Sequence, residues 1–209
     1  MSGPDKLSRT VIWRRVMDHK SFELATLSRT SDLCRIAGLV LLAESDRPMR
    51  VEYTTDCNAS WETRTVNVHQ VLGEQIQKLV LRVEADAWYR ADSRAPELDG
   101  CTDVDLGISP STNSLPINRL NLRVGETREV QAAWVRFPEC DVIAAPQSYE
   151  RVEASLYRYR SLSSEFTALL KVDEVGLPID YEGIWERMAC ITGSKSVEAF
   201  RLSRVNTQV

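Results

Sequence analysis

The sequence predicts an all-β protein, on two observations. Apolar and polar residues alternate with a period of two along several runs, and Gly, Pro, Asp and Asn separate these runs at short intervals. A period of two places alternate side chains on opposite faces of a strand, and frequent turn residues favour antiparallel neighbours. The pattern is typical of an antiparallel sandwich, roll or barrel, and it leaves these three open.

The first clear strands are predicted to form a hairpin over residues 63–71 and 75–85. In the first run, "TRTVNVHQV", Val66 and Val68 fall on one face and polar residues on the other. Gly73 lies between the two runs, where a tight turn needs a residue that tolerates a left-handed backbone. The two runs are therefore expected to pair directly.

Three later runs continue the pattern, and we expect their apolar residues to point inward. Trp134 follows an alternating series in the first run, and Tyr157 and Tyr159 share one face of the second. Phe166 begins an inward series in the third. The runs cover residues 128–137, 154–162 and 165–181, and the last is predicted to turn at 173–176 and resume.

One segment, residues 105–120, does not alternate. Its sequence, "DLGISPSTNSLPINRL", offers Ser109 as an N-cap and Pro110 as the first helical residue. The apolar residues that follow could form one face, and Pro116 would shorten the helix because it removes a backbone donor. This segment is the predicted helix, and a weaker helical pattern occupies residues 194–204.

Length and composition favour one soluble domain over residues 1–209. We expect its core over about residues 11–190, with both ends loose. A net charge of −4 gives no electrostatic footprint for nucleic acid. The longest apolar stretch, residues 36–43, is too short for a transmembrane segment. The first residues contain no apolar run of signal-peptide length, so we expect a cytoplasmic protein.

The residues that usually carry catalysis or metals are sparse. Five dispersed cysteines without a CxxC pair argue against a disulfide scaffold and a zinc site, so we expect buried, reduced thiols. His19 and His69 lack metal-ligand spacing, and we expect them to be structural. No nucleophile motif is present. The sequence thus predicts no cofactor and no metal, and it favours a protein that is not an enzyme.

An acidic cluster and an isolated tryptophan are the candidate site features. Asp99, Asp103 and Asp105 could bind a cation or serve in glycoside hydrolysis, although a turn at Asp99 with flanking acids is the simpler interpretation. Trp61 lies near acidic and arginine side chains, a combination that sugar and head-group recognition uses. The other four tryptophans are expected in the core: Trp13, Trp88, Trp134 and Trp185.

A longer pattern carries a resemblance to a known family. The segment "LDGCTDVDLGISPSTNSLPINRLNLRVGE" (98–126) resembles the central motif of a bacterial family catalogued as "putative glycolipid-binding", formerly a domain of unknown function. The likeness covers about residues 13–187. Ser111 and Asn118 depart from the pattern, which has an aromatic residue and a second arginine there. Further matches are "YTTDCNASWETRTVNV" (53–68), "PQSYERV" (146–152), "YRY" (157–159) and "LKVDEVGLPIDYEGIWERM" (170–188).

The resemblance implies both a fold and a site. The implied fold is a many-stranded antiparallel meander rolled around a single central helix, a spiral β-roll, in which residues 105–120 supply the helix. Polar groups enclosed by such a sheet are costly unless they are hydrogen-bonded or meet a ligand. The expected ligand-binding residues are Asp56, Trp61, Arg64, Asp103, Asp105, Thr112, Asn113, Arg119, Tyr149 and Tyr159.

Three functions are compatible with these observations. The first is non-enzymatic binding of a small amphiphile, such as a glycolipid, with its chain on apolar strand faces and its head group on the polar residues. The second is hydrolysis of a sugar-containing or acyl substrate through Asp103, Asp105 or Asp173. The third is a structural role, in which the polar motifs only stitch the core. Exposed strand edges would also allow a homodimer.

Overall fold

The structure is a computed structural model that describes residues 7–17, 21–44 and 47–193. The described chain is all-β, as predicted, with one short α-helix. The first strands are β1 (Leu7–Arg15), β2 (Phe22–Arg29), β3 (Leu33–Glu44), β4 (Arg47–Asn58), β5 (Thr63–Leu72), β6 (Gln75–Glu84), β7 (Ala87–Arg90) and β8 (Ser93–Arg94). The short 3₁₀ helix η1 (Pro96–Leu98), β9 (Asp103–Leu106), the 3₁₀ helix η2 (Ser111–Asn113), α1 (Ser114–Leu120), β10 (Thr127–Arg136), β11 (Asp141–Glu153), β12 (Leu156–Ser161), β13 (Thr167–Val172), β14 (Pro178–Tyr181) and β15 (Trp185–Gly193) follow.

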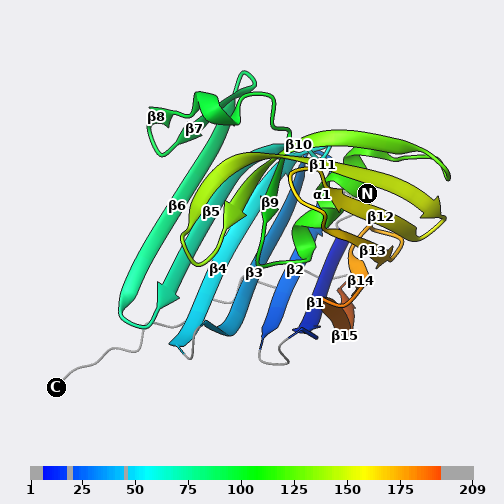
Figure 1. Ribbon diagram of the computed structural model, residues 1–209, viewed down its shortest axis with the longest axis horizontal. Helices are drawn as coiled ribbons and strands as arrows, with labels where there is room; N and C mark the ends of the chain where they lie inside the picture. The colour runs from blue at the N-terminus through cyan, green and yellow to red at the C-terminus, as the bar shows by residue number, and fades with distance from the viewer. Residues whose placement is uncertain (1–6, 18–20, 45–46, 194–209) are drawn as a thin grey trace, which may run out of the picture.

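All described strands belong to one sheet, made of two meanders. Strands β1 to β8 pair in chain order, and so do β10 to β15. The meanders join where β1 pairs with β15, and this pairing brings the first and last described strands together in the middle of the sheet. In Figure 1 the strands β10 to β13 roll over the broad layer of β1 to β6, with α1 between the two layers. The expected meander rolled around a helix is confirmed.

Every pairing in the sheet is antiparallel except one. Strand β9 runs parallel to β10, with Asp105 opposite Trp134. Parallel neighbours need a long connection, and here residues 107–126, which include η2 and α1, supply it. The sequence analysis did not predict this parallel edge strand, because β9 has only four residues and lies beside the non-alternating segment.

The predicted hairpins are confirmed, with two corrections to side-chain burial. Strands β5 and β6 pair across the turn at Gly73, which has a φ of 59°. Val66, Val68, Tyr157 and Tyr159 are buried as expected. Phe166 is 41% exposed, because it precedes β13 and lies outside the paired part of the strand. Trp134 is half-buried beside a cavity and is not a core residue.

The interior between the two layers is packed with apolar side chains. Trp13 and Trp88 are fully buried, as expected. Tyr53 covers Gly38 on the neighbouring strand, where a Cβ atom would lie 2.5 Å from its ring. Gln70 Nε2 donates to the carbonyl oxygen of Pro138 at 2.6 Å and thereby fixes the β10–β11 turn over β5. The roll is thus closed by polar contacts around an apolar core.

The predicted helix forms where the sequence placed it. Pro110 already has helical backbone angles, and Ser109 Oγ accepts a hydrogen bond from the Ser111 backbone at 3.0 Å, as an N-cap residue would. A 3₁₀ turn therefore precedes α1. Asn121 ends α1 in the left-handed conformation, with a φ of 43°.

Several expectations concern the ends and the cysteines. The paired strands extend past the expected core, from Leu7 to Gly193. The weak helical pattern at 194–204 and His19 lie outside the described residues. Cys34, Cys57 and Cys101 are buried, whereas Cys190 is exposed, contrary to expectation. No helix in the described ranges is long and apolar enough to cross a membrane.

Threonine hydroxyls close the outer edge of β9. Thr63 Oγ1 accepts the backbone N–H of Val104 at 3.0 Å, and Thr112 Oγ1 accepts that of Leu106 at 3.1 Å. An unpaired edge would otherwise expose these donors to another strand. The β9 edge therefore offers no pairing site for a second copy, and a homodimer stays a prediction.

Replacing Thr63 with Val should lower the free energy of unfolding by about 1–3 kcal/mol, because it leaves the buried Val104 N–H without an acceptor. Urea denaturation followed by tryptophan fluorescence measures this loss. Thr26→Val is the matched control, since Thr26 bonds Thr10 at 3.0 Å on the partly exposed outer face. Equal effects of the two substitutions would contradict the proposed role of Thr63.

Candidate ligand-binding site

An ion pair joins the helix to the edge strand. Arg119 on α1 donates from Nε to Asp103 Oδ1 at 3.0 Å and from Nη2 to Oδ2 at 2.5 Å. Asp103 is 1% exposed, and Thr102 Oγ1 donates to it as well, at 3.0 Å. Two-point contact of this kind fixes the angle between the groups as well as their distance. Both residues were expected to bind a ligand. In the structure their charged groups bond to each other instead.

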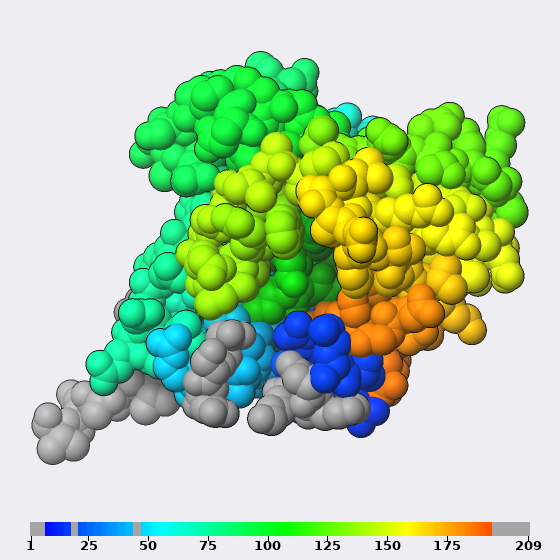
Figure 2. All heavy atoms as spheres, in the orientation of Figure 1, coloured from blue at the N-terminus to red at the C-terminus, as the bar shows by residue number. Residues whose placement is uncertain are grey.

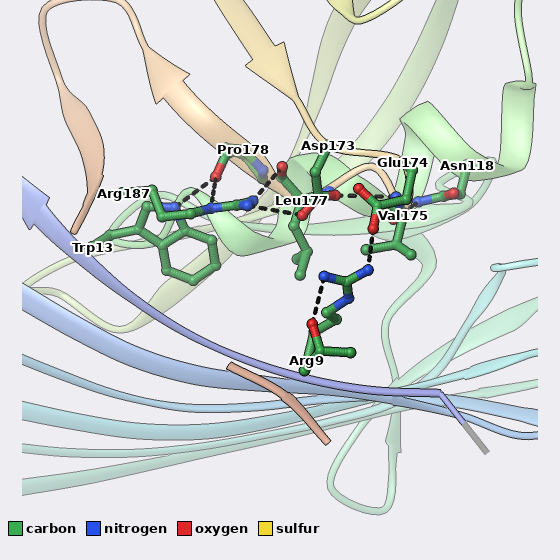
Figure 3. Close-up of polar contacts among 10 residues, drawn as sticks. Arg9, Trp13, Asn118, Asp173, Glu174, Val175, Leu177, Pro178 and Arg187 are labelled. Atoms are coloured by element: carbon green, nitrogen blue, oxygen red, sulfur yellow. Dashed lines mark hydrogen bonds and ion pairs between the residues drawn. The ribbon is translucent and has the colours of Figure 1, made fainter. Parts of the chain in front are cut away.

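A second buried aspartate holds the loop between β13 and β14 (Figure 3). Asp173 Oδ1 accepts the backbone N–H groups of Val175 and Leu177, at 3.1 and 3.0 Å. Its Oδ2 lies 2.9 Å from Nη1 of Arg187, which also donates to the carbonyl oxygens of Leu177 and Pro178. Asp173, a candidate for hydrolysis, thus serves to shape this loop.

A cavity of about 340 Å³ opens beside the helical segment; we call it the aromatic cavity. Figure 2 shows this hollow between the yellow-green surface of β10 and β11 and the yellow and orange surfaces of β12 to β15, with green residues of the central segment inside it. Its polar lining includes Ser109, Ser161, Ser163 and Ser164. The other lining residues used below are Arg15, Met17, Asp105, Gly107, Asn113, Trp134, Gln147, Tyr159, Phe166, Tyr181 and Trp185.

Aromatic rings form one wall of the cavity, from the interior to its mouth. Tyr149, buried behind the wall, meets Tyr159 edge to face, with ring centroids 5.4 Å apart. Tyr159 contacts Tyr181 at 6.3 Å and the exposed Phe166 at 5.9 Å. Within the described residues, the hydroxyls of Tyr159 and Tyr181 have no hydrogen-bond partner, so both are available to a ligand.

Trp134 forms another part of the wall and depends on a glycine. A Cβ atom on Gly107 would lie 2.6 Å from Trp134 Nε1, so only glycine allows the indole to lie this close to the chain. The Arg136 guanidinium lies 6.0 Å from the indole centroid. Trp134 is thereby held against β9, directly across from Asp105.

Asp105 supplies the carboxylate of the cavity. Gln147 Nε2 donates to its Oδ2 at 2.6 Å. Burial raises the pKa of Asp105 to about 6, although the hydrogen bonds from Gln147 and Thr112 act in the opposite direction. Burial and the nearby Asp105 charge also raise the pKa of Tyr159, so the phenol stays protonated.

A buried polar network lies behind the cavity. Ser109, which lines the cavity, donates to Glu23 Oε1 at 2.7 Å, and Tyr53 donates to the same oxygen. Ser111 Oγ lies 2.6 Å from the Tyr53 hydroxyl, so serine at this departure from the family pattern joins the network. Glu23 is fully buried, and burial raises its pKa to about 7.

A second cavity of about 340 Å³ lies beside α1 and the Asp173 loop, and three of its polar side chains, Asn118, Arg151 and Asp173, bond within the protein. Asn118 Nδ2 donates to the carbonyl oxygens of Ser114 and Val175, at 2.8 and 3.0 Å. Arg151 donates to backbone carbonyl oxygens. The departure at Asn118 therefore ties the helix to the loop, as Figure 3 shows.

The ten expected ligand-binding residues divide into three groups. Asp105, Asn113 and Tyr159 line the aromatic cavity. The four residues of the second group form internal polar contacts. Asp103 pairs with Arg119, Thr112 accepts a backbone N–H of β9, and Tyr149 donates to Asn113 Oδ1 at 2.9 Å. The third group, Asp56, Trp61 and Arg64, lies at the β4–β5 hairpin and lines neither cavity.

The hairpin group has its own structural contacts. Asp56 pairs with Arg35, whose Nε lies 2.5 Å from its Oδ1, and Arg64 donates to Glu62 at 2.8 Å. Trp61 is buried with a φ of 68°, and the Arg29 guanidinium lies 5.3 Å from its ring. These side chains shape the turn between β4 and β5.

Sequence reasoning missed several lining residues: Arg15, Met17, Trp134, Gln147, Phe166, Tyr181 and Trp185. Gln147, Tyr181 and Trp185 lie inside the motifs "PQSYERV" and "LKVDEVGLPIDYEGIWERM", so the motifs carried a usable signal. Trp134 and Phe166 lie on alternating patterns that are indistinguishable from core strands. The partial exposure of Trp134 follows from the rolling of the sheet, whereas Phe166 is exposed because it precedes the paired part of β13.

The fold and this cavity define an all-β protein with a small, partly aromatic cavity beside a central helix. Residues 10–187 match the family described as "Putative glycolipid-binding", and the chain belongs to this family. The resemblance inferred from the motifs is thereby confirmed. No curated protein matches the chain.

A solved structure is similar over most of the chain. It is the crystal structure of a Pseudomonas aeruginosa protein of the same family, under the earlier designation as a domain of unknown function. The two share 33% sequence identity, and the match covers 81% of this chain and 92% of that chain, with a TM-score of 0.75. The likeness supports the family and the fold, and it names no ligand.

Arg119→Met should lower the free energy of unfolding by about 3–5 kcal/mol, because Asp103 would stay buried without its partner. Adding Asp103→Leu should recover part of that loss. Urea denaturation gives both values. Arg128→Met breaks an exposed pair with Glu126 and should change stability by no more than about 1 kcal/mol. A similar small effect at Arg119 would show that its ion pair is dispensable.

The raised pKa values of Glu23 and Asp105 predict how stability changes with pH. Both groups bind a proton more tightly in the folded protein, so their contribution is fully present below about pH 4 and is lost as pH rises through about 6 and 7. Each contributes a slope of at most about 1.4 kcal/mol per pH unit.

Urea midpoints between about pH 5 and pH 8 measure this slope. The double variant Glu23→Gln, Asp105→Asn should show a flatter profile than the wild type, because neither amide titrates. Glu74→Gln, at an exposed turn, should leave the profile unchanged. If the double variant keeps the wild-type slope of stability against pH, groups other than Glu23 and Asp105 cause that slope.

Proposed function

We propose that the protein binds the head group of a small amphiphile in the aromatic cavity, without catalysis. The observation that carries this proposal is the pairing of aromatic walls with free polar groups in one cavity. Sites for small molecules combine an apolar lining with a few placed polar groups, and about 340 Å³ is near the lower end of their range. The cavity thus suits a head group better than a whole lipid.

The packing of the core supports an orientation with the head group inside and the chain outside. The inner strand faces are filled by their own side chains, such as Val11 and Val40, which are fully buried. Met17, which is 63% exposed, and Phe166 line the cavity and lie partly at the surface, with the exposed Leu162 in the adjoining loop. An acyl chain leaving the cavity would meet these apolar side chains.

A sugar is the head-group chemistry that the lining and the family description favour. Aromatic faces stack against the apolar faces of sugar rings, while Asp105 and Gln147 offer hydrogen bonds in a fixed direction. The description of the family as glycolipid-binding agrees with this chemistry. The ligand would be held by few polar contacts within a shaped apolar wall.

The contacts of the aspartates argue against the hydrolase alternative. Paired-carboxylate hydrolysis requires two acids across one cleft. Arg119 holds Asp103 and Arg187 holds Asp173, whereas Asp105 is the carboxylate that lines the aromatic cavity. The purely structural alternative accounts for Thr112 and Tyr149, but it assigns no partner to the Tyr159 and Tyr181 hydroxyls.

Trp134→Ala should weaken binding of octyl β-glucoside by at least about tenfold, because it removes one wall of the cavity. Isothermal titration calorimetry below the critical micelle concentration measures the affinity. Tyr89→Ala is the control, since Tyr89 is a half-buried aromatic residue between Arg82 and Arg94 that lies outside the cavity. An equal loss in the control would refute a specific role for Trp134.

Native mass spectrometry of the purified wild type, followed by organic extraction, tests the function without a chosen probe. A co-purifying amphiphile that is absent from Trp134→Ala would support the proposal and give the ligand class. A clean apo mass that takes up no added glycolipid would favour the structural role.

A further inference from the structure

Three aspartates near the central segment differ in whether their carboxylate pairs with a positive charge. Asp103 faces the Arg119 guanidinium and Asp173 faces that of Arg187. Asp105 accepts hydrogen bonds from neutral groups and forms no ion pair with any described residue, and the charge of Asp103 raises its pKa further. Buried carboxylates are rarely left without a positive partner, because losing water is costly. The positive partner of Asp105 is missing from the described part of the chain.

The surroundings of Asp105 offer further acceptors. The phenol oxygens of Tyr159 and Tyr181 lie close enough to Asp105 for its charge to raise the pKa of both groups. Gln147 donates to Asp105 through Nε2, which leaves its carbonyl oxygen available as an acceptor. A primary ammonium carries three donors, so a carboxylate with phenol and amide oxygens matches its hydrogen-bonding needs.

The aromatic lining selects an organic cation over a metal ion. Rings such as Trp134, Trp185 and Phe166 attract ammonium groups through their negative faces. Hard metal ions instead require several oxygen ligands. The described residues contain no group of three or more His, Cys, Asp or Glu side chains that could hold a metal ion.

We propose that the head group bound in the aromatic cavity carries a primary ammonium, as an amino sugar does, and that its nitrogen pairs with Asp105. This inference rests on the proposed function and names the chemistry of its ligand. The ammonium would then neutralise Asp105, as the guanidinium of Arg119 neutralises Asp103 and that of Arg187 neutralises Asp173. Apolar walls strengthen this pairing, because they exclude water from it.

Protonation of Asp105 should oppose binding of an ammonium. The charged and titratable groups around Asp105 are Asp103 on its own strand, Arg15 on β1, and the cavity tyrosines Tyr159 on β12 and Tyr181 on β14. Behind the cavity wall lies Tyr149 on β11, which stays protonated because burial and the Asp105 charge raise its pKa. Glu23 on β2 acts only through Ser109. Between about pH 5 and pH 7 both cavity tyrosines stay protonated, because their pKa values are raised above the ordinary value. Asp105 and Glu23 are therefore the groups in this set that change charge.

The test compares three octyl glycosides that differ at one position of the sugar. They are octyl β-glucoside, its 2-amino-2-deoxy analogue and the N-acetyl form of that analogue, titrated by calorimetry below their critical micelle concentrations. At about pH 7 the amine should bind the wild type at least about tenfold more tightly than the other two. Its advantage should shrink at about pH 5, while the affinity of octyl β-glucoside stays constant.

Asp105→Asn should bring the three affinities together, since it keeps the shape of the side chain and removes the charge. Asp86→Asn, at an exposed turn between β6 and β7, makes the same charge change away from the cavity and should retain the preference. Asp86 tolerates this change because asparagine accepts its φ of 63°. The pH comparison on the wild type gives the same answer if Asp105→Asn does not fold.

Three results would overturn the inference or its basis, and they are distinguishable. Equal binding of amine and hydroxyl analogues to the wild type would reject the ammonium and leave the proposed function standing. A preference for the amine that survives Asp105→Asn would place the cation on another group. Absence of binding by all three glycosides and by added glycolipid would reject the proposed function itself.

Discussion

The ion pair between Arg119 and Asp103 holds the central helix against the edge strand of the sheet. It ties α1 to β9, and β9 in turn pairs with β10, the first strand of the second meander. A helical segment rich in polar groups can lie inside a rolled sheet only if those groups find partners there. The threonine caps on β9, the Asn113–Tyr149 contact and the Glu23 network meet the same requirement. The central segment is thus built as a polar framework within an apolar roll.

The cavity lies where this framework leaves two tyrosine hydroxyls without a hydrogen-bond partner among the described residues, beside a carboxylate that pairs with no described cation. Most polar side chains of the central motif bond to one another, so their presence in the motif follows from packing and says nothing of a ligand. Asp105 and the hydroxyls of Tyr159 and Tyr181 differ, since they share a cavity and its aromatic walls. A binding function therefore rests on a small part of the motif, and the rest holds that part in place.

The sequence predicted where the strands and the helix lie, but it predicted less of how the strands pair and which side chains remain exposed. Period-two patterns located the strands around Val66 and Tyr157, and the Ser109-Pro110 pair located the helix, because these signals depend on local geometry. The parallel pairing of β9 with β10 and the exposure of Trp134 depend on how the sheet rolls, which no local pattern records. The same limit applies to Asp56, Trp61 and Arg64, because a sequence motif does not record that they lie at the β4–β5 hairpin, outside both cavities.

The pairing of β1 with β15 has a consequence for how the chain is made. These strands are central in the sheet, yet β1 is synthesised first and β15 last among the described strands. During translation the first meander can form by local pairing, but one edge of β1 stays unpaired until its partner residues, 170 to 185 positions later in the chain, are synthesised. An unpaired edge on a growing chain invites association with other chains. The order of synthesis thus makes this sheet most prone to association with other chains just before β15 is added.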